Sequence, residues 1–454
     1  MFHKQEVFSV DQETKTCVLS KNPDAPLVKK VFEVLQLTEA DLKDDFHSVY
    51  TLGKLPMKRL VFVDEKSFLK GKTTEQLFKL KEDILVLVDT FSKEKVSQLF
   101  EVLTTASYRF SKFKSKDEEH IENIHYTTTE KVDDRIHEGI VYGEAINHTK
   151  QLVNTPYNYL NAFKLADYAQ TLGDLEGVEV KVYGKAECEA MNMGAFLGVN
   201  KGSKDEPQLI HVRYQGNKNE EDITALIGKG VMFDTGGYSL KTPTGMPSMK
   251  CDMAGAATVL GAIEIIARQK YPKNVDVVIA ATDNRIGDDA IVPDDILTAA
   301  NGTTIEIVST DAEGRLTLAD ALWFAQKEGA SKLIDVATLT GAVVGALGKE
   351  YTGAFTNNQA FLDNVLSISQ NTEEKIWQLP ICEGYHNDLK SFSADIKNSG
   401  GSRLAGASVA AAFLEKFVEN DRPWIHLDVA GTAFDSKIGG TGIMVKTLAR
   451  IFKA

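Results

Sequence analysis

The sequence is poor in cysteine, and the few cysteines that it has are far apart. Four occur in 454 residues, at Cys17, Cys188, Cys251 and Cys382, and no two of them form a C-x-x-C pair. Scattered single cysteines exclude a disulfide framework of the kind that holds small secreted domains together. We therefore expect the four cysteines to be free thiols and the protein to reside in a reducing compartment.

Long hydrophobic runs are also missing. Residues 1–15 lack the apolar core of a signal peptide, and no stretch reaches the roughly 18 uninterrupted apolar residues of a membrane-spanning helix. Hydrophobic residues make up 43% of the chain and charged residues 25%, as is typical of a globular protein in water. The sequence predicts a cytoplasmic protein without a membrane partner.

Positive charge is in short supply. The chain has 51 Lys and Arg against 64 Asp and Glu, a formal net charge of −13. Its basic runs are short, such as KFKSK at 112–116, and acidic residues follow at once. Because phosphate contacts supply most of the non-specific affinity for nucleic acids, a chain without a basic stripe is not expected to bind them.

Two familiar site motifs are absent as well. The chain contains neither the H-E-x-x-H pattern of many zinc peptidases nor the G-x-x-x-x-G-K-[ST] phosphate loop. Its nine histidines are dispersed, and His426, within WIHLDVAG at 424–431, is predicted to be a packed core residue rather than a ligand. Any metal chemistry must therefore use other residue types.

What is present is an alternation of strand and helix patterns in a chain too long for one ordinary core. Residues 1–130 are predicted to form a small α/β domain without a cluster of catalytic residue types. A polar, charged stretch at 111–130 marks its end, and residues 131–154 are predicted to be a connecting helix. Residues 155–454 then form a larger domain.

The larger domain repeats the strand–helix pattern more regularly. Strands are expected at 178–184, 208–214, 223–229, 275–282, 304–310, 332–338 and 424–431, with helices at 256–270 and 315–329. This alternation predicts a parallel or mixed sheet covered by helices on both faces. In such sheets ligands bind outside the carboxyl ends of the strands.

Charged residues gather in three segments of this domain. The segments are GKGVMFDTGGYSLK (228–241), MKCDMAGAATVLGA (249–262) and STDAEGRLTLADAL (309–322). They carry the carboxylates Asp234, Asp252, Asp311 and Glu313 and the bases Lys229, Lys241 and Arg315. Four carboxylates at one sheet edge would repel one another unless cations neutralised them, and two divalent ions about 3.5–4 Å apart fit that number. Oxygen ligands with one possible amine favour Mn²⁺, Mg²⁺ or Zn²⁺.

Two of these carboxylates also have a purely structural interpretation. Thr310-x-x-Glu313 has the form of a capping box, in which a hydroxyl and a carboxylate satisfy free N–H groups at a helix start. Asp252 stands just before a helix of small residues and could cap it. Taken alone, neither segment decides between helix capping and metal binding.

The three segments, in this order, closely resemble the signature segments of the leucyl aminopeptidase (cytosol aminopeptidase) family. Further similarity lies in LVNTPYNYL (152–160), DVATLTGA (335–342), SADIKNSGGSRLAGASVAAAFLEKFV (393–418) and HLDVAGTAF (426–434). The resemblance is strong over about residues 150–454 and rests on general architecture before that. It implies an α/β fold of two domains: a small N-terminal macro-like domain and a larger C-terminal mixed-sheet, zinc-peptidase-like α/β/α catalytic domain.

The resemblance implies a metal-dependent aminopeptidase that removes the N-terminal residue of peptides, preferably leucine or another apolar residue. The positions that match the family's dinuclear metal ligands are Lys229, Asp234, Asp252, Asp311 and Glu313. In the implied mechanism the two ions, Mn²⁺ or Zn²⁺ with Mg²⁺ as a third candidate, bind the substrate's free amine and scissile carbonyl and hold a bridging hydroxide. Lys241 stabilises the oxyanion, and Arg315 holds a bicarbonate that acts as general base.

The pocket for the first substrate residue is also carried over from the family. Its positions are Met249, Thr338, Gly341 and Ala430. An apolar pocket of this kind discriminates by only about 1–3 kcal/mol per methylene, so broad specificity is expected.

The sequence departs from the family pattern near the site. Ser309 stands where the family usually has asparagine, Thr235 replaces serine, and Tyr238 replaces an aliphatic residue. Tyr238 is the departure that we expect to narrow the pocket.

The family also implies partners, and alternatives stay open. Peptides with a free N-terminus are the expected substrates, and the resemblance implies a homohexamer with the N-terminal domains outside. A dipeptidase with narrow substrate specificity, for example one acting on cysteinylglycine, would have the same metal-binding, catalytic and pocket residues. A DNA-binding regulator with secondary peptidase activity is a further alternative, against which the net charge weighs. The N-terminal domain could bind a small ligand, although no residue cluster demands it.

Overall fold

The computed structural model describes residues 1–6, 8–116, 121, 123–402 and 404–453. The chain divides into two compact units, Met1–Asn147 and His148–Ala454. The boundary falls inside one long helix, α5 (Asp133–Asn154). Part of the predicted junction at 111–130, and Arg403 within the family-like segment 393–418, lie outside the described residues.

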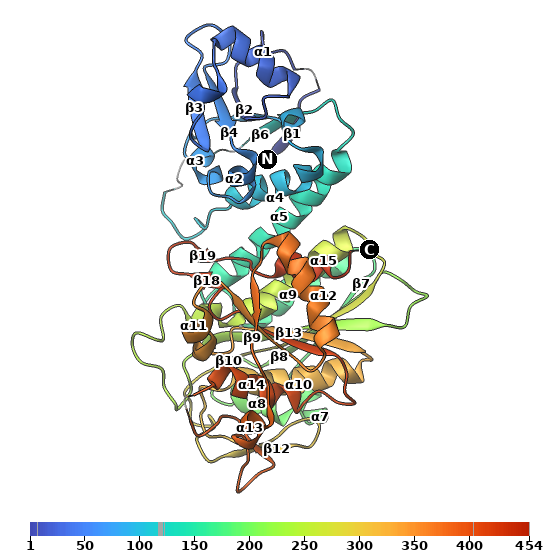
Figure 1. The fold of residues 1–454 in the computed structure, drawn as a ribbon. Helices are drawn as coiled ribbons and strands as arrows, with labels where there is room; N and C mark the ends of the chain where they lie inside the picture. The colour runs from blue at the N-terminus through green and yellow to red at the C-terminus, as the bar shows by residue number, and fades with distance from the viewer. Residues whose placement is uncertain (7, 117–120, 122, 403, 454) are drawn as a thin grey trace. The chain divides into compact units, whose positions relative to one another are not determined.

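The N-terminal unit is built on a six-stranded sheet (Figure 1). Its strand order is β1 (Phe2–Lys4), β6 (Ile124–Thr127), β5 (Ile84–Leu87), β2 (Thr16–Ser20), β4 (Arg59–Val63) and β3 (Phe46–Tyr50). Only the β3–β4 pair is antiparallel among these neighbours. Its helices are α1 (Pro26–Leu35), α2 (Glu65–Leu69), α3 (Thr74–Phe78), α4 (Val96–Ala106) and the first part of α5.

Successive residues of the central strand β2 serve two separate cores in this unit. Leu19 packs into one core with Val28 of α1, whereas Val18 packs into the other with Phe100 of α4. The alternation follows from the two-residue period of a strand, whose side chains point to opposite faces. The unit is therefore an α/β structure with a helix layer on each face of its sheet.

The larger unit is built on an eight-stranded mixed sheet. Its order is β15 (Ile376–Gln378), β14 (Thr352–Thr356), β17 (Trp424–Asp428), β13 (Lys332–Ala337), β9 (Ile223–Asp234), β10 (Asn274–Asn284), β8 (Gln208–Gln215) and β7 (Val178–Tyr183). The four central strands, from β17 to β10, are parallel, and β8 and β14 run antiparallel to the strands that flank this block. The prediction of a mixed sheet is confirmed.

Helices cover both faces of this sheet (Figure 1). A Cβ atom on Gly228 of β9 would meet Ala256 of α9 (Ala254–Arg268), whereas the next side chain, Lys229, contacts Gly314 of α10 (Gly314–Lys327). Because consecutive strand residues point to opposite faces, α9 and α10 lie on opposite sides. α15 (Val445–Arg450) and α12 (Gln359–Thr372) join the α9 layer, and α8 (Gly194–Asn200) and α14 (Gly406–Glu415) join the α10 layer.

Shorter elements complete the larger unit. They are the helices α6 (Ala162–Thr171), α7 (Lys185–Ala190), α11 (Gly341–Leu347) and α13 (Glu383–Asn387), and the small sheets β11 (Ile296–Thr298), β12 (Thr304–Glu306), β16 (Ile396–Lys397) and β18 (Phe434–Asp435), β19 (Gly439–Gly440). No helix within the described residues has the length and apolar character needed to cross a membrane.

Two strands differ in length from the prediction, and both bear on the site. β9 was expected to end at residue 229 but continues to Asp234, because it pairs with β10 as far as Asn284. The strand expected at 304–310 ends at Glu306, so the STDAEGR segment begins in a loop. Asp234 is thus the last residue of a central strand, at the carboxyl edge of the parallel block.

His426 lies in the core, as predicted. Its side chain is fully buried on β17, its Nδ1 lies 2.6 Å from Asp335 Oδ1, and Asp335 Oδ2 accepts a hydrogen bond of 2.7 Å from Trp424 Nε1. Burial alone would lower the pKa of His426, but the Asp335 carboxylate raises it above its ordinary value.

Gly255, the second residue of α9, allows this helix to lie directly against the sheet. A Cβ atom here would lie 2.0 Å from the carbonyl oxygen of Val336 on β13 and 3.0 Å from the amide nitrogen of Lys229 on β9. Heavy atoms cannot approach so closely, so this position requires glycine. The contact also sets the position of Asp252, which lies in the turn of helix that precedes α9.

Replacing Gly255 tests this packing. Gly255→Ala must push α9 away from β13, and we expect a loss of about 1–3 kcal/mol of stability, the usual cost of overpacking. The thermal unfolding midpoint measures the effect. Gly345→Ala is the matched control, since a Cβ atom on this exposed residue of α11 meets nothing within 4 Å. Equal midpoints for the two variants would contradict the account.

Candidate metal centre

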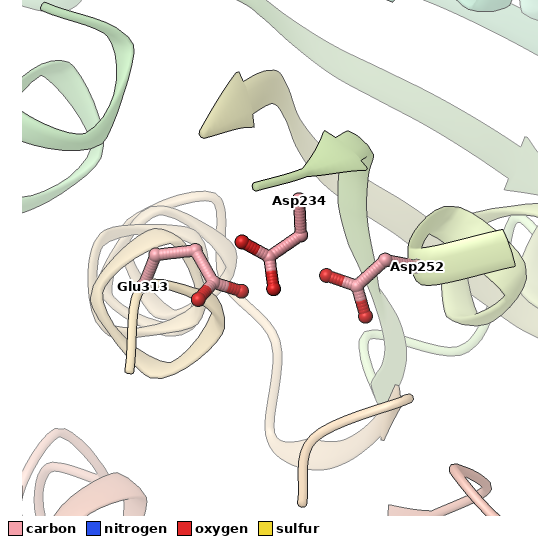
Figure 2. A group of neighbouring side chains, drawn as sticks. All are labelled: Asp234, Asp252 and Glu313. Atoms are coloured by element: carbon pink, nitrogen blue, oxygen red, sulfur yellow. The ribbon is translucent and has the colours of Figure 1, made fainter. Parts of the chain in front are cut away.

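Three buried carboxyl groups meet at the carboxyl edge of the central strands. Asp234 ends β9, Asp252 lies in the short 3₁₀ helix η5 (Met249–Met253), and Glu313 immediately precedes α10. One oxygen of each group lies within 4.8 Å of the others, and the three side chains point toward one another (Figure 2). All three residues are at most 5% exposed. Their mutual repulsion requires compensating positive charge.

Lys229 supplies positive charge on one side of this cluster. Its Nζ lies 2.8 Å from Asp252 and 2.9 Å from Glu313 Oε1, and it donates a hydrogen bond of 3.0 Å to the carbonyl oxygen of Thr338. Burial alone would lower the pKa of Lys229, but Asp252 and Glu313 raise it above its ordinary value. The ammonium group therefore holds two of the carboxylates in place.

Lys241 supplies positive charge on the other side. Its Nζ lies 2.6 Å from Asp234 Oδ2 and 2.5 Å from Asp311 Oδ1. Asp311 is the most accessible member of the cluster, with a side chain that is 38% exposed. Burial alone would lower the pKa of Lys241, but Asp234, Glu313 and Asp311 raise it. The two lysines thus bring all four predicted carboxylates into one network.

The carboxyl groups titrate differently because their surroundings differ. Burial and the Glu313 carboxylate raise the pKa of Asp234 to about 6, and burial raises the pKa of Asp252 well above its ordinary value. For Glu313, burial is outweighed by Lys229 and Lys241, which lower its pKa. Glu313 therefore loses its proton more readily than Asp234 or Asp252.

The residues present fit a divalent cation. Glu313 Oε2 is buried and accepts no hydrogen bond within the part of the chain that the structure describes, and Asp252 Oδ2 has the Lys229 ammonium, 2.8 Å away, as its partner there. Buried carboxylate oxygens without donors are costly, and carboxylates are ligands that hard and intermediate divalent ions prefer. An amine such as Lys229 could join them only after losing its proton.

The structural interpretations of the same carboxylates are wrong. Thr310 forms no capping box: its Oγ1 donates a hydrogen bond of 2.6 Å to the carbonyl oxygen of Gly236 and accepts one of 2.7 Å from Ser239 N. Glu313 occupies the N-cap position of α10 without a capping hydrogen bond. Asp252 likewise does not cap α9, since its Oδ1 accepts hydrogen bonds from Lys229 and Thr338.

One cavity of about 530 Å³ contains the cluster. Every residue that the sequence analysis proposed for the site lines it. These are Lys229, Asp234, Asp252, Asp311, Glu313, Lys241, Arg315, Met249, Thr338, Gly341 and Ala430. Apolar side chains that were not predicted, among them Leu240, Leu339 and Val344, line the same cavity. Charged residues and apolar surface therefore share one space.

Arg315 lies at the start of α10 and is 7% exposed. Its Nη1 donates a hydrogen bond of 2.8 Å to the carbonyl oxygen of Asn398, and its buried Nε has no hydrogen-bond partner among the described residues. Burial lowers the pKa of Arg315 to about 10, so it remains a cation at neutral pH. A cationic side chain with an unused donor is suited to hold an anion.

The departures from the family pattern lie at the edge of the site. The hydroxyl of Tyr238 donates a hydrogen bond of 3.2 Å to the carbonyl oxygen of Gly287. Tyr238 is not among the described residues that line the cavity. The prediction that Tyr238 narrows the pocket is wrong, because this contact directs the side chain elsewhere. Ser309 Oγ accepts a hydrogen bond of 3.3 Å from Asp311 N.

Two buried asparagines that the sequence analysis missed support the site. Asn284 Nδ2 donates to Asp234 Oδ1, and Asn398 Oδ1 accepts hydrogen bonds from Val308 N and Ser309 N. The search for the site in the sequence rested on clusters of charged residues, and a neutral amide side chain does not contribute to such a cluster. The signal for Asn284 was its place just after a predicted strand at the ligand-binding edge, whereas Asn398 had only its place in a family-like segment.

Comparisons with known proteins give matches over most of the chain. The family model described as the cytosol aminopeptidase family, catalytic domain (Peptidase M17), matches residues 147–449. The chain is 40% identical to the "Probable cytosol aminopeptidase" of Bacillus subtilis (strain 168), over 97% of this chain and 96% of that protein. It also resembles the solved structure of a mutant of tomato leucine aminopeptidase, with 29% identity, a TM-score of 0.86, and coverage of 99% of this chain and 96% of that one.

Removing the ammonium of Lys229 tests the charge balance of the cluster. Lys229→Met leaves Asp252 and Glu313 buried without their cation, and breaking a buried pair in this way costs about 3–5 kcal/mol. We expect a clearly lower thermal midpoint in the presence of a chelator. In the control Lys332→Met, the pair lost is the exposed one with Asp222, worth about 0–1 kcal/mol. Equal effects in the two variants would contradict the account.

Proposed function

The chain belongs to the cytosol aminopeptidase family and is a metal-dependent aminopeptidase, and from this premise we propose that it uses two divalent ions to release apolar N-terminal residues, leucine above all. The observation that carries the proposal is the single cavity that collects five potential metal ligands, two further cations and an apolar pocket.

The metal ligands of the proposal are Lys229, Asp234, Asp252, Asp311 and Glu313, a set that fits Mn²⁺, Zn²⁺ or Mg²⁺. When bound, two such ions would polarise the peptide carbonyl and supply a water of lowered pKa as nucleophile. The cluster separates into a buried part, around Lys229, and a more accessible part, around Asp311. We propose that each part holds one ion.

The remaining charged residues act on the substrate in this proposal. Lys241 keeps its proton at neutral pH and lies beside Asp234 and Asp311, so its ammonium can stabilise the oxyanion that forms on the scissile carbonyl. Arg315 offers an unused, buried N–H donor in the cavity wall. We propose that Arg315 would hold a bicarbonate ion, which would supply a general base for the attacking water when bound.

Specificity for the first residue follows from the pocket wall. We propose that Met249, Thr338, Gly341 and Ala430 surround this side chain, and the apolar neighbour Val344 extends the same wall. Thr338 is held in place because its Oγ1 donates to Asp252 and its carbonyl oxygen accepts from Lys229. A wall of this composition favours leucine and methionine over charged residues, with only modest discrimination among apolar ones.

Three further points, on the substrates, the compartment and the oligomeric state, rest on the family rather than on the site. We propose that the substrates are peptides with a free N-terminus, and that the protein acts in the cytoplasm as a homohexamer. The Bacillus subtilis relative is named a cytosol aminopeptidase, which supports the compartment.

Hydrolysis of leucine p-nitroanilide tests the requirement for metal and for a free amine. We expect no cleavage by metal-stripped protein and recovery on addition of Mn²⁺ or Zn²⁺. N-acetyl-leucine p-nitroanilide should remain uncleaved, because its blocked amine cannot be held at the metal centre. Cleavage of the acetylated compound, or activity that persists without metal, would count against the proposal.

Replacing Asp311 tests the number of ions. Asp311→Asn should lower the bound Mn²⁺ from two ions per chain toward one and reduce kcat/KM by more than about 100-fold, since even the outer partners of metal ligands are worth 10–100-fold. Elemental analysis and steady-state kinetics measure both effects. Asp363→Asn, which makes the same charge change on the exposed face of α12, should leave both unchanged. Two ions in the Asp311 variant would exclude it as a ligand.

A further inference from the structure

Asn284 is a buried residue that contacts two segments of the metal centre, the end of β9 and the loop before α10. It is the last residue of β10, is 2% exposed, and stands in register with Asp234 at the end of β9. Its single amide nitrogen donates two hydrogen bonds, each of 2.9 Å, one to Asp234 Oδ1 and the other to the carbonyl oxygen of Thr310. The amide therefore uses both of its N–H groups.

The first of these hydrogen bonds selects which oxygen of Asp234 stays available. Asp234 Oδ1 accepts from Asn284 Nδ2 and also, at 2.8 Å, from the backbone amide of Gly236. Oδ2 is left beside Lys241 Nζ, 2.6 Å away. With two donors fixing one oxygen, the other has a defined direction, which is the usual role of groups that surround a metal ligand.

The second hydrogen bond fixes the loop that carries the other carboxylates. Thr310 directly precedes Asp311, and Glu313 follows two residues later. Because Asn284 holds the carbonyl oxygen of Thr310, it ties this loop to the end of the central strands. The backbone of Asn284 strengthens the same junction, since its carbonyl oxygen accepts from Thr235 N and Thr235 Oγ1 at 3.0 and 2.8 Å.

We propose that Asn284 is a positioning residue that sets the spacing between Asp234 and the loop bearing Asp311 and Glu313, and thereby the affinity of the site for its metal ions. Asn284 itself ligates no ion. A neutral amide is suited to this place because it donates two hydrogen bonds without adding a further charge to the cluster. The inference rests on the proposed function, because it concerns the same metal centre.

Isothermal titration calorimetry, in which Mn²⁺ is added to metal-stripped protein, measures the affinity and tests the inference. Asn284→Leu keeps a similar side-chain size and removes both hydrogen bonds. We expect its affinity for Mn²⁺ to fall about 10–100-fold, the range found when outer partners of metal ligands are removed. If Asn284→Leu does not fold, Asn284→Ser, whose hydroxyl can replace at most one of the two donors, should show a loss in the same direction.

Asn200→Leu is the matched control. Asn200 is 8% exposed, and its Nδ2 also donates two hydrogen bonds, to the carbonyl oxygen of Asp205 and to Thr282 Oγ1 on β10. Both variants should lose thermal stability, but only the Asn284 variant should lose metal affinity. Unchanged affinity in a folded Asn284 variant, or equal losses in both variants, would overturn the inference. Failure of the wild-type protein to bind Mn²⁺ would instead contradict the proposed function on which the inference rests.

Discussion

Repulsion among buried carboxylates is the constraint on which the architecture of the larger unit depends. Asp234, Asp252 and Glu313 are nearly inaccessible to water and lie within 4.8 Å of one another. Such a cluster is stable only with cations at the same place, and the chain provides two of its own, Lys229 and Lys241. Divalent ions bound at the same place would add further positive charge and would supply the catalytic chemistry, by polarising a carbonyl group and lowering the pKa of a bound water.

The fold meets the constraint by bringing distant segments to one sheet edge. Parallel strands end on the same side, so β9, β10 and β13 deliver Asp234, Asn284 and Thr338 to one place although they are far apart in the sequence. α9 and α10 start at this edge on opposite faces, which places Asp252 and Glu313 across from each other. Close packing at Gly255 holds the first of these helices in position.

The charged residues of the site could be predicted from the sequence because their chemistry is visible there. An acidic residue after an apolar run marks the end of a strand. The resemblance of the surrounding segments to the family then assigned each charged residue a role as metal ligand or catalytic group. The neutral residues that support them were not visible: Asn284 and Asn398 act through geometry, and geometry depends on strand pairing over long sequence separations. For the same reason, the capping-box interpretation of Thr310 and the prediction that Tyr238 narrows the pocket were wrong, since tertiary hydrogen bonds to Gly236 and Gly287 override the local patterns.

The proposed function requires two divalent ions in the cavity around Glu313. Diffraction from crystals grown with Mn²⁺, collected at the manganese absorption edge, locates such ions directly. We expect two anomalous peaks about 3.5–4 Å apart, in contact with Asp234, Asp252, Asp311, Glu313 and Lys229. A single peak, or peaks that avoid Glu313, would contradict the proposed function.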